Sequence, residues 1–181
     1  IAAVDHPNVV AVYDIGTRRE RGADRVWLAM ELVTGHGLEQ WATAERSPSE
    51  VVELMAQVAQ GLDAVPAAGL VHRDLQPSNI LVGRDGRPRV ADFGLARTEP
   101  RRMSTDAGAG ELDTRPMPLV HDHHGGLTAT GAVMGTPAYM APEQMIGEPC
   151  TPRSDQFSFF VILHELLFRQ RPFPGKNLHT L

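Results

Sequence analysis

The stretch from Leu70 to Ala96 constrains the fold more than any other part of this chain, and it reads LVHRDLQPSNILVGRDGRPRVADFGLA. Near its centre, Asp85-Gly86 is a strong signal for a two-residue β-hairpin turn, because both central residues of such a turn need positive φ and this pair tolerates it. The apolar residues 80–82 lead into the turn, and residues 88–91 form the returning strand. The stretch therefore predicts a short hairpin between polar loops.

Three polar side chains gather at the open end of this predicted hairpin. A two-residue turn pairs Asn79 with Asp92, which sets an amide oxygen beside a carboxylate. Two such oxygens suit Mg²⁺, which keeps several waters and also takes phosphate oxygens. Asp74 precedes Asn79 by five residues, so a short loop can aim its carboxylate at the same space to accept a proton from an attacking hydroxyl. Singly, these residues are typical of turns and loop starts; together with the register they predict a site.

The chain resembles the protein kinases in three motifs that occur in the expected order. The letters HRDL at 72–75, followed by Asn79, resemble the kinase catalytic loop, and DFG at 92–94 resembles its metal-binding motif. The letters APE at 141–143 supply the third motif. The sequence is therefore similar to eukaryotic-like serine/threonine protein kinases of the bacterial type, and it matches them as a piece truncated at both ends.

The resemblance implies an α+β, protein-kinase-like bilobal fold. Residues 1–33 correspond to a remnant of the small lobe with the hinge, and this remnant holds a pair of strands. Residues 34–181 correspond to a mainly helical large lobe that is incomplete at its carboxy terminus, with an activation segment at about 92–143. The chain begins with Ile1 rather than methionine, so we expect it to be part of a longer reading frame.

The resemblance also assigns catalytic roles. Asp74 is the catalytic base, Asn79 and Asp92 hold Mg²⁺, and Thr136 in the substrate-docking loop orients the acceptor hydroxyl. Gln76 stands where the family has a lysine on the transferring phosphate. Glutamine reaches nearly as far but carries no charge, and losing one preorganised contact of this kind costs roughly 10²–10³ in rate.

Four further residues are assigned to the nucleotide, which the resemblance identifies as ATP. Met30 is the gatekeeper, and Glu31 to Val33 form the hinge, with the backbone of Val33 bonding the adenine. Leu81 in the hairpin, together with Asp92, completes this set. From the residues alone, a plain hydrophobic hairpin explains the segment before position 33 nearly as well.

Regulation follows from the arginine beside the catalytic aspartate. Arg73 occupies the position at which a phosphothreonine of the activation segment pairs with arginine and orders that segment. Thr128 and Thr130 are the predicted acceptors. Within the same segment His121, His123 and His124 resemble a metal site, but they lack a second ligand pair, which favours a solvated loop.

Two function classes remain open at this point. The glycine-rich loop, the strand lysine and its glutamate partner are absent from the sequence, and the only lysine, Lys176, follows the catalytic loop. We therefore expect a kinase fragment that is inactive alone and transfers the ATP γ-phosphate to protein Ser/Thr hydroxyls in the complete protein. The alternative is a pseudokinase-type binding or scaffold module, which Gln76 and the missing lysine favour.

Composition narrows the partners and the location. The net charge of -5 argues against a nucleic-acid or anionic-membrane surface. The single cysteine, Cys150, forms no disulfide within the chain and indicates a reducing compartment. The longest apolar run, residues 157–168, is too short and too polar to span a bilayer. We expect a protein substrate and ATP as partners, no nucleic acid and no membrane segment. We also expect a cytoplasmic location, either as a free protein or as the cytoplasmic domain of a larger, membrane-anchored kinase.

Local patterns predict four secondary-structure elements outside the hairpin. Strands are predicted at 9–15 and 25–32 with a loop at 16–24, and residues 1–32 are expected to be poorly anchored because two strands alone are marginal. A helix begins at Ser47, with Glu50 closing a capping box, buries one apolar face and ends near Pro66. A second helix, capped by Asp155, is apolar on nearly every side, and the resemblance makes Asp155 a support for the catalytic-loop backbone.

Overall fold

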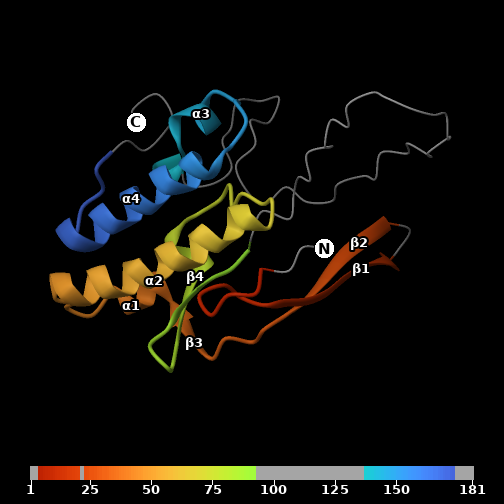
Figure 1. Cartoon of the computed structure of the whole chain (residues 1–181), viewed down its shortest axis with the longest axis horizontal. Helices are drawn as coiled ribbons and strands as arrows, with labels where there is room; N and C mark the ends of the chain where they lie inside the picture. The colour runs from red at the N-terminus through yellow and green to blue at the C-terminus, as the bar shows by residue number, and fades with distance from the viewer. Residues whose placement is uncertain (1–3, 21–22, 93–136, 174–181) are drawn as a thin grey trace.

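The computed structural model describes residues 4–20, 23–92 and 137–173. A two-stranded sheet, β1–β2, extends to one side of the molecule, and a three-stranded sheet in the order β3–β4–β5 lies against the helices (Figure 1). In chain order the elements are β1 Val12–Glu20, β2 Ala23–Met30, β3 Gly35–Gly37, α1 Leu38–Trp41, α2 Pro48–Ala67, the 3₁₀ helix η1 Pro77–Asn79, β4 Ile80–Gly83, β5 Pro88–Val90, the 3₁₀ helix η2 Pro137–Tyr139, α3 Pro142–Met145 and α4 Pro152–Phe168.

Helix α2 forms as its sequence predicts. The Ser47 N–H donates to Glu50 Oε2 over 2.8 Å, and the Glu50 N–H donates to Ser47 Oγ over 3.2 Å, so the capping box is confirmed. The helix ends at Ala67, one residue after Pro66, because proline cannot continue the hydrogen-bond ladder. Its apolar face packs against α4 and β5 and is buried at Val51, Leu54, Met55, Val58 and Val65.

Helix α4 differs from its prediction in two respects. Its N-cap is Thr151, whose hydroxyl accepts from the Arg153 N–H over 3.2 Å, so Asp155 lies within the first turn and does not cap the helix. The expectation of burial on every side is also wrong, because Phe160 and Phe168 are 56% and 61% exposed. Among the described elements, α4 packs mainly against α2 and η2.

The strands β1 and β2 extend into the stretch that was predicted to be a loop. They pair from the Val12–Met30 end to the Glu20–Ala23 end, with one register shift between Val12 and Asp14. The predicted loop at 16–24 is therefore wrong for residues 16–20 and 23–24. The polar residues there concealed the strands, because a sheet with water on both faces needs no apolar alternation. The sheet exposes large apolar side chains, with Tyr13 71% and Val26 58% exposed.

Residues 8–10 are held firmly, unlike the sheet that follows them. The Val10 N–H donates to Val90 O and the Val90 N–H donates to Asn8 O, each over 2.9 Å, and Val9 and Val10 are buried. The Asn8 amide also donates to Pro88 O over 2.9 Å. The expectation of poor anchoring is therefore wrong for this segment and stays a prediction for β1–β2.

The predicted hairpin is present as β4–β5, but its register is one residue from the prediction. Ile80 pairs with Val90, so Asn79 lies opposite Ala91 and not opposite Asp92. The turn has three residues, 84–86: the Gly86 N–H donates to Gly83 O over 2.9 Å, and Gly86 has a φ of 76°. This is a type I turn followed by a left-handed glycine, the next most common hairpin after the two-residue form.

The structure contains no segment suited to a bilayer within residues 4–20, 23–92 and 137–173. None of the helices there combines the length and the apolar character needed to cross a membrane.

Candidate active site

The loop between α2 and η1 is held in place by a side chain from α4. Asp155 Oδ2 accepts the His72 N–H over 2.7 Å, and its Oδ1 accepts the Arg73 N–H over 2.8 Å. The expected support of the loop backbone by Asp155 is thus confirmed. Burial raises the pKa of the Asp155 carboxyl, while these two N–H donors lower it by stabilising the charged form.

The peptide at Arg73 is strained, and both of its polar groups are bonded. Arg73 has a φ of 70°, a left-handed conformation that costs a non-glycine residue roughly 1–2 kcal/mol. Asp155 takes its N–H, and the Gln144 side-chain amide donates to its carbonyl oxygen over 2.7 Å. Two segments distant in sequence therefore hold the strained turn that precedes Asp74.

His72 connects this loop to the end of β5. The imidazole is fully buried, its Nε2 lies 2.9 Å from Ala91 O, and its Nδ1 accepts the Asp74 N–H over 3.3 Å. These partners fit a neutral ring with the proton on Nε2. Burial lowers the pKa of His72, against the opposing influence of Asp155.

This lowered pKa predicts acid destabilisation. The unfolded His72 binds a proton as the pH falls below 6.5 whereas the buried ring resists it, so its contribution is complete above pH 6.5 and is lost on acidification. The slope from this group is at most about 1.4 kcal/mol for each pH unit. Urea unfolding at pH 7.5 and 5.5 measures it. His72→Gln is expected to remove this part of the slope and His164→Gln to retain it; equal slopes in all three proteins would contradict the prediction.

The carboxylate of Asp74 is oriented by two amide side chains. The Asn79 amide donates to Asp74 O over 2.8 Å and to Asp74 Oδ2 over 3.3 Å. The Gln76 amide donates to the same Oδ2 over 3.2 Å. The structure therefore brings Asp74, Gln76 and Asn79 together, while their catalytic roles remain predictions.

The predicted metal ligands lie at neighbouring backbone positions. The Ala91 N–H donates to Asn79 O over 2.8 Å, and Asp92 follows Ala91 with an exposed side chain and a φ of 56°. Because the amide nitrogen of Asn79 is directed at Asp74, its Oδ1 is directed away, where it accepts a long 3.4 Å bond from the Ser78 hydroxyl.

Such a donor set fits Mg²⁺, which needs only one or two protein oxygens when phosphate and water supply the rest. Residues 4–20, 23–92 and 137–173 hold no group of three or more His, Cys, Asp and Glu residues arranged for a metal.

The residues assigned to the nucleotide lie in or near the hairpin β4–β5. Met30 ends β2, and Glu31 and Val33 are half-buried in the segment that runs from β2 to β3. Leu81 lies in the middle of β4, on the face opposite the buried Ile80. β3 pairs with β4, with Gly37 opposite Leu81. The end of the segment before β3 lies beside the hairpin turn, where the Arg84 N–H donates to Thr34 O over 2.9 Å.

Comparison with known proteins decides the family. The protein kinase domain family matches residues 1–181, the whole chain. The chain belongs to the protein kinase family. The expected bilobal α+β kinase fold is confirmed with it, whereas the lobe boundaries at 33 and 34 remain predictions.

Bacterial serine/threonine kinases are similar to this kinase chain along nearly its whole length. Serine/threonine-protein kinase PknA of Mycobacterium tuberculosis is 34% identical over 183 residues, which cover 99% of the chain and 37% of PknA. The probable kinase PknB of Corynebacterium glutamicum is 31% identical, over 96% of the chain and 24% of that protein. The kinase pkn2 of Myxococcus xanthus is 33% identical, over 97% and 19%. The chain thus spans well under half the length of these relatives, and the resemblance to bacterial-type kinases is confirmed.

Several predicted kinase residues lie outside the described part of the chain. Thr136, Thr128 and Thr130 are among them, as are the three histidines at 121, 123 and 124. Their assigned roles remain predictions. Arg73 is described, and it immediately precedes Asp74 as its predicted regulatory role requires.

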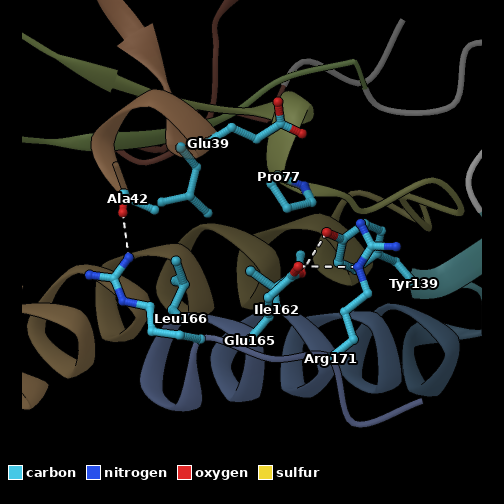
Figure 2. A pocket seen from close by; sticks show the side chains of 10 residues that line it. Glu39, Ala42, Pro77, Tyr139, Ile162, Glu165, Leu166 and Arg171 are labelled. Atoms are coloured by element: carbon cyan, nitrogen blue, oxygen red, sulfur yellow. Dashed lines mark hydrogen bonds and ion pairs between the residues drawn. The ribbon is translucent and has the colours of Figure 1, made fainter. Parts of the chain in front are cut away.

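Sequence reasoning missed a polar network beneath the kinase docking loop. The Tyr139 hydroxyl donates to Glu165 Oε2 over 2.6 Å, and Arg171 Nε lies 3.1 Å from Glu165 Oε1 (Figure 2). Burial and the bond to Glu165 raise the pKa of Tyr139. The network borders a cavity of about 360 Å³ between α1, Pro77 and α4. The signal in the sequence was Tyr139, which lies two residues before Ala141, the first residue of the APE motif.

Proposed function

We propose that this chain carries the catalytic loop, the metal ligands and the substrate-docking loop of a serine/threonine protein kinase that transfers the ATP γ-phosphate to protein Ser/Thr hydroxyls. The orientation of Asp74 carries the proposal. Its carboxylate is fixed by Asn79 and Gln76, in a loop whose strained backbone is held by Asp155. A turn cap needs no such support from a helix distant in sequence.

Each group has a defined part in the transfer. Asp74 accepts the proton of the attacking hydroxyl. Asn79 and Asp92 bind the Mg²⁺ that neutralises charge on the phosphate oxygens, and little else than position and charge is needed for this chemistry. A small cavity of about 30 Å³ lies between Asp74, Tyr139 and Met140.

Gln76 supports the transfer without a charge. Its amide contacts the Asp74 carboxylate over 3.2 Å, which orients the base. Glutamine in place of the family's lysine at position 76 is therefore compatible with the proposed kinase activity. No contact at the site favours a scaffold without phosphotransfer.

The remaining parts of the proposal concern ATP and location. Met30, Glu31 and Val33 border the adenine in this proposal because they lie at the end of β2 and in the segment that leads into β3, and β3 pairs with β4, the strand that carries Leu81. The need for ATP and the presence of a single cysteine favour a cytoplasmic location. The chain would there belong either to a free kinase or to the cytoplasmic part of a membrane-anchored kinase.

The test is phosphotransfer by the full-length protein that carries this chain, with Mg-ATP and a mixed Ser/Thr peptide library. We expect Asp92→Asn to raise the Mg²⁺ concentration for half-maximal rate at least about tenfold, because one of two ligands loses its charge. Asp63→Asn, a change at an exposed carboxylate of α2, is expected to leave the Mg²⁺ titration unchanged. Transfer that is absent in the unmodified protein, or indifferent to Asp92, would refute the proposal.

A further inference from the structure

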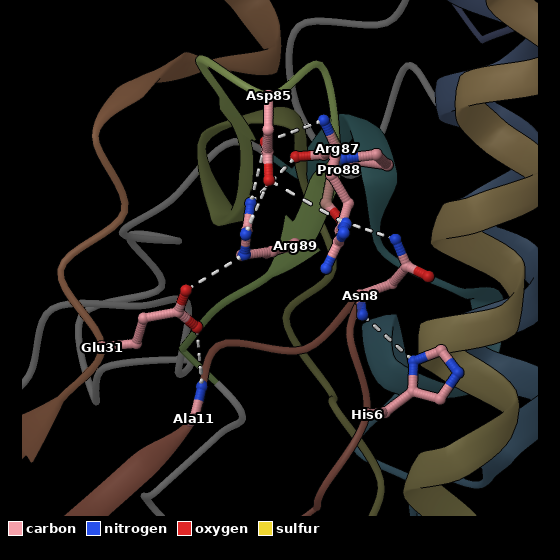
Figure 3. A network of polar contacts seen from close by, with 8 residues as sticks. All are labelled: His6, Asn8, Ala11, Glu31, Asp85, Arg87, Pro88 and Arg89. Atoms are coloured by element: carbon pink, nitrogen blue, oxygen red, sulfur yellow. Dashed lines mark hydrogen bonds and ion pairs between the residues drawn. The ribbon is translucent and has the colours of Figure 1, made fainter.

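Arg89 of the hairpin β4–β5 joins two acidic side chains from different parts of the chain (Figure 3). Arg89 Nη1 and Nη2 bond Asp85 Oδ1 and Oδ2 over 3.3 and 3.0 Å, as a fork, and Arg89 Nε lies 3.2 Å from Glu31 Oε1. The Arg89 side chain is only 13% exposed. Its hydrogen bonds hold the pKa of Asp85 at about 2.

Glu31 is in turn fixed to the strand before it. Its N–H donates to Ala11 O over 2.8 Å, and its Oε2 accepts the Ala11 N–H over 3.4 Å. Its side chain is 29% exposed. Glu31 therefore has a defined position from its backbone, and the carboxylate extends from there to Arg89.

The two ends of this connection lie at different parts of the proposed nucleotide site. Glu31 begins the segment proposed to bond the adenine, two residues before Val33. Arg89 lies three residues before Asp92, on the strand that ends at the metal ligands. The guanidinium thus forms a bridge that joins the adenine-bonding segment to the hairpin β4–β5, whose open end leads to Asp92.

We infer that Arg89 is a positioning residue for nucleotide binding: its ion pair with Glu31 sets the distance between the adenine-bonding segment and the metal-binding end of the hairpin. This inference rests on the proposed function and deepens it. Asp85 preorganises the guanidinium as a planar fork, which limits the conformations from which Arg89 reaches Glu31.

Loss of the bridge affects ATP binding more than the chemical step. Without Arg89 the adenine segment still forms, because Glu31 keeps its backbone bond to Ala11. Asp74 and Asn79 keep their own contacts, none of which includes Arg89. Arg89→Gln and Glu31→Gln are therefore expected to raise the KM for ATP roughly 5–10-fold and to change kcat less than about twofold, the pattern of lost binding that is equal in ground and transition states.

The experiment uses the full-length protein and a double-mutant cycle. Glu31→Gln, Arg89→Gln and the double variant are compared for the KM for ATP, for kcat and for the Kd of a fluorescent ATP analogue. If the pair acts as one bridge, the double variant is no worse than either single variant. Arg89→Lys is expected to recover part of the affinity, because it keeps the charge and loses the fork.

Arg87→Gln is the matched control. Arg87 also approaches Asp85, with Nε 3.9 Å from Oδ2, but it is 47% exposed and makes no contact with Glu31. It is expected to keep the KM of the unmodified protein. Should Arg89→Gln fold poorly, Glu31→Gln tests the same pair with a smaller change at a more exposed position.

The outcomes separate the two proposals. Normal phosphotransfer with unchanged KM in both Glu31→Gln and Arg89→Gln overturns the bridge alone. An equal fall in kcat and kcat/KM, or additive effects in the double variant, also overturns it. An unmodified protein that neither binds the analogue nor transfers phosphate overturns the proposed function, and the bridge with it.

Discussion

Asp74→Asn is expected to lower the kcat of the full-length protein by about 10²–10⁴-fold, because the attacking hydroxyl loses its proton acceptor. The amide has nearly the same shape, and its oxygen can still accept bonds from Asn79 and Gln76, which now reach Asp74 Oδ2 over 3.3 and 3.2 Å. The KM for ATP is therefore expected to change little. Steady-state kinetics with a phosphorylated peptide as product gives both constants.

Two comparisons make this result specific to the base. Asp63→Asn removes a carboxylate from the exposed face of α2 and is expected to keep the kcat of the unmodified protein. Urea unfolding of Asp74→Asn is expected to match the unmodified protein within about 0.5 kcal/mol. A kcat within tenfold of the unmodified value would remove Asp74 from the proposed mechanism.

The largest loss of stability is expected for Asp155→Ala. The substitution leaves the N–H groups of His72 and Arg73 without their acceptor in a site where Asp155 is 7% exposed. Each unsatisfied buried donor costs roughly 1–3 kcal/mol, so the unfolding free energy should fall by roughly 2–6 kcal/mol. Chemical denaturation measured by circular dichroism provides the value.

Asp155→Asn serves as a graded control for this loss. Its single amide oxygen satisfies one of the two donors, so its effect should be about half as large. Amide exchange of His72 and Arg73 should accelerate in both variants more than exchange in the middle of α2. A loss below about 1 kcal/mol in Asp155→Ala would show that the loop has another support.

The hairpin shows what the sequence could and could not predict. The Asp85-Gly86 pair located the turn, because few dipeptides tolerate positive φ. It did not distinguish a turn of two residues from one of three, since Asp85 suits either and only Gly86 takes positive φ. The predicted pairing of Asn79 with Asp92 was therefore one residue off, although both still lie at the open end.

Local rules succeeded where the interaction is local. The capping box joins Ser47 to Glu50, only three residues further along the chain, and it was predicted correctly. Asp155 shows the opposite case: a helix-capping rule placed it at the N-cap, but Thr151 and Pro152 precede it and begin the helix. Its contact with the catalytic loop came from the family resemblance, because no local pattern links positions so far apart.

Two of the contacts that sequence reasoning missed join distant segments. Tyr139 reaches Glu165, and Arg89 reaches Glu31. The local sequence around each side chain gives no sign of its partner. The packing of β5 against the segment after β2 brings Arg89 to Glu31 (Figure 3), and the packing of η2 against α4 brings Tyr139 to Glu165 (Figure 2). Such pairs follow from tertiary packing, which periodicity does not encode.

The bond between Asp155 and His72 spans 83 positions of the chain. A ribosome must therefore release α4 before the strained turn at Arg73 gains the acceptor that stabilises it, and closing so long a loop is slow relative to local folding. The loop that carries Asp74 therefore reaches its supported conformation late in biogenesis, only after α4 has been synthesised.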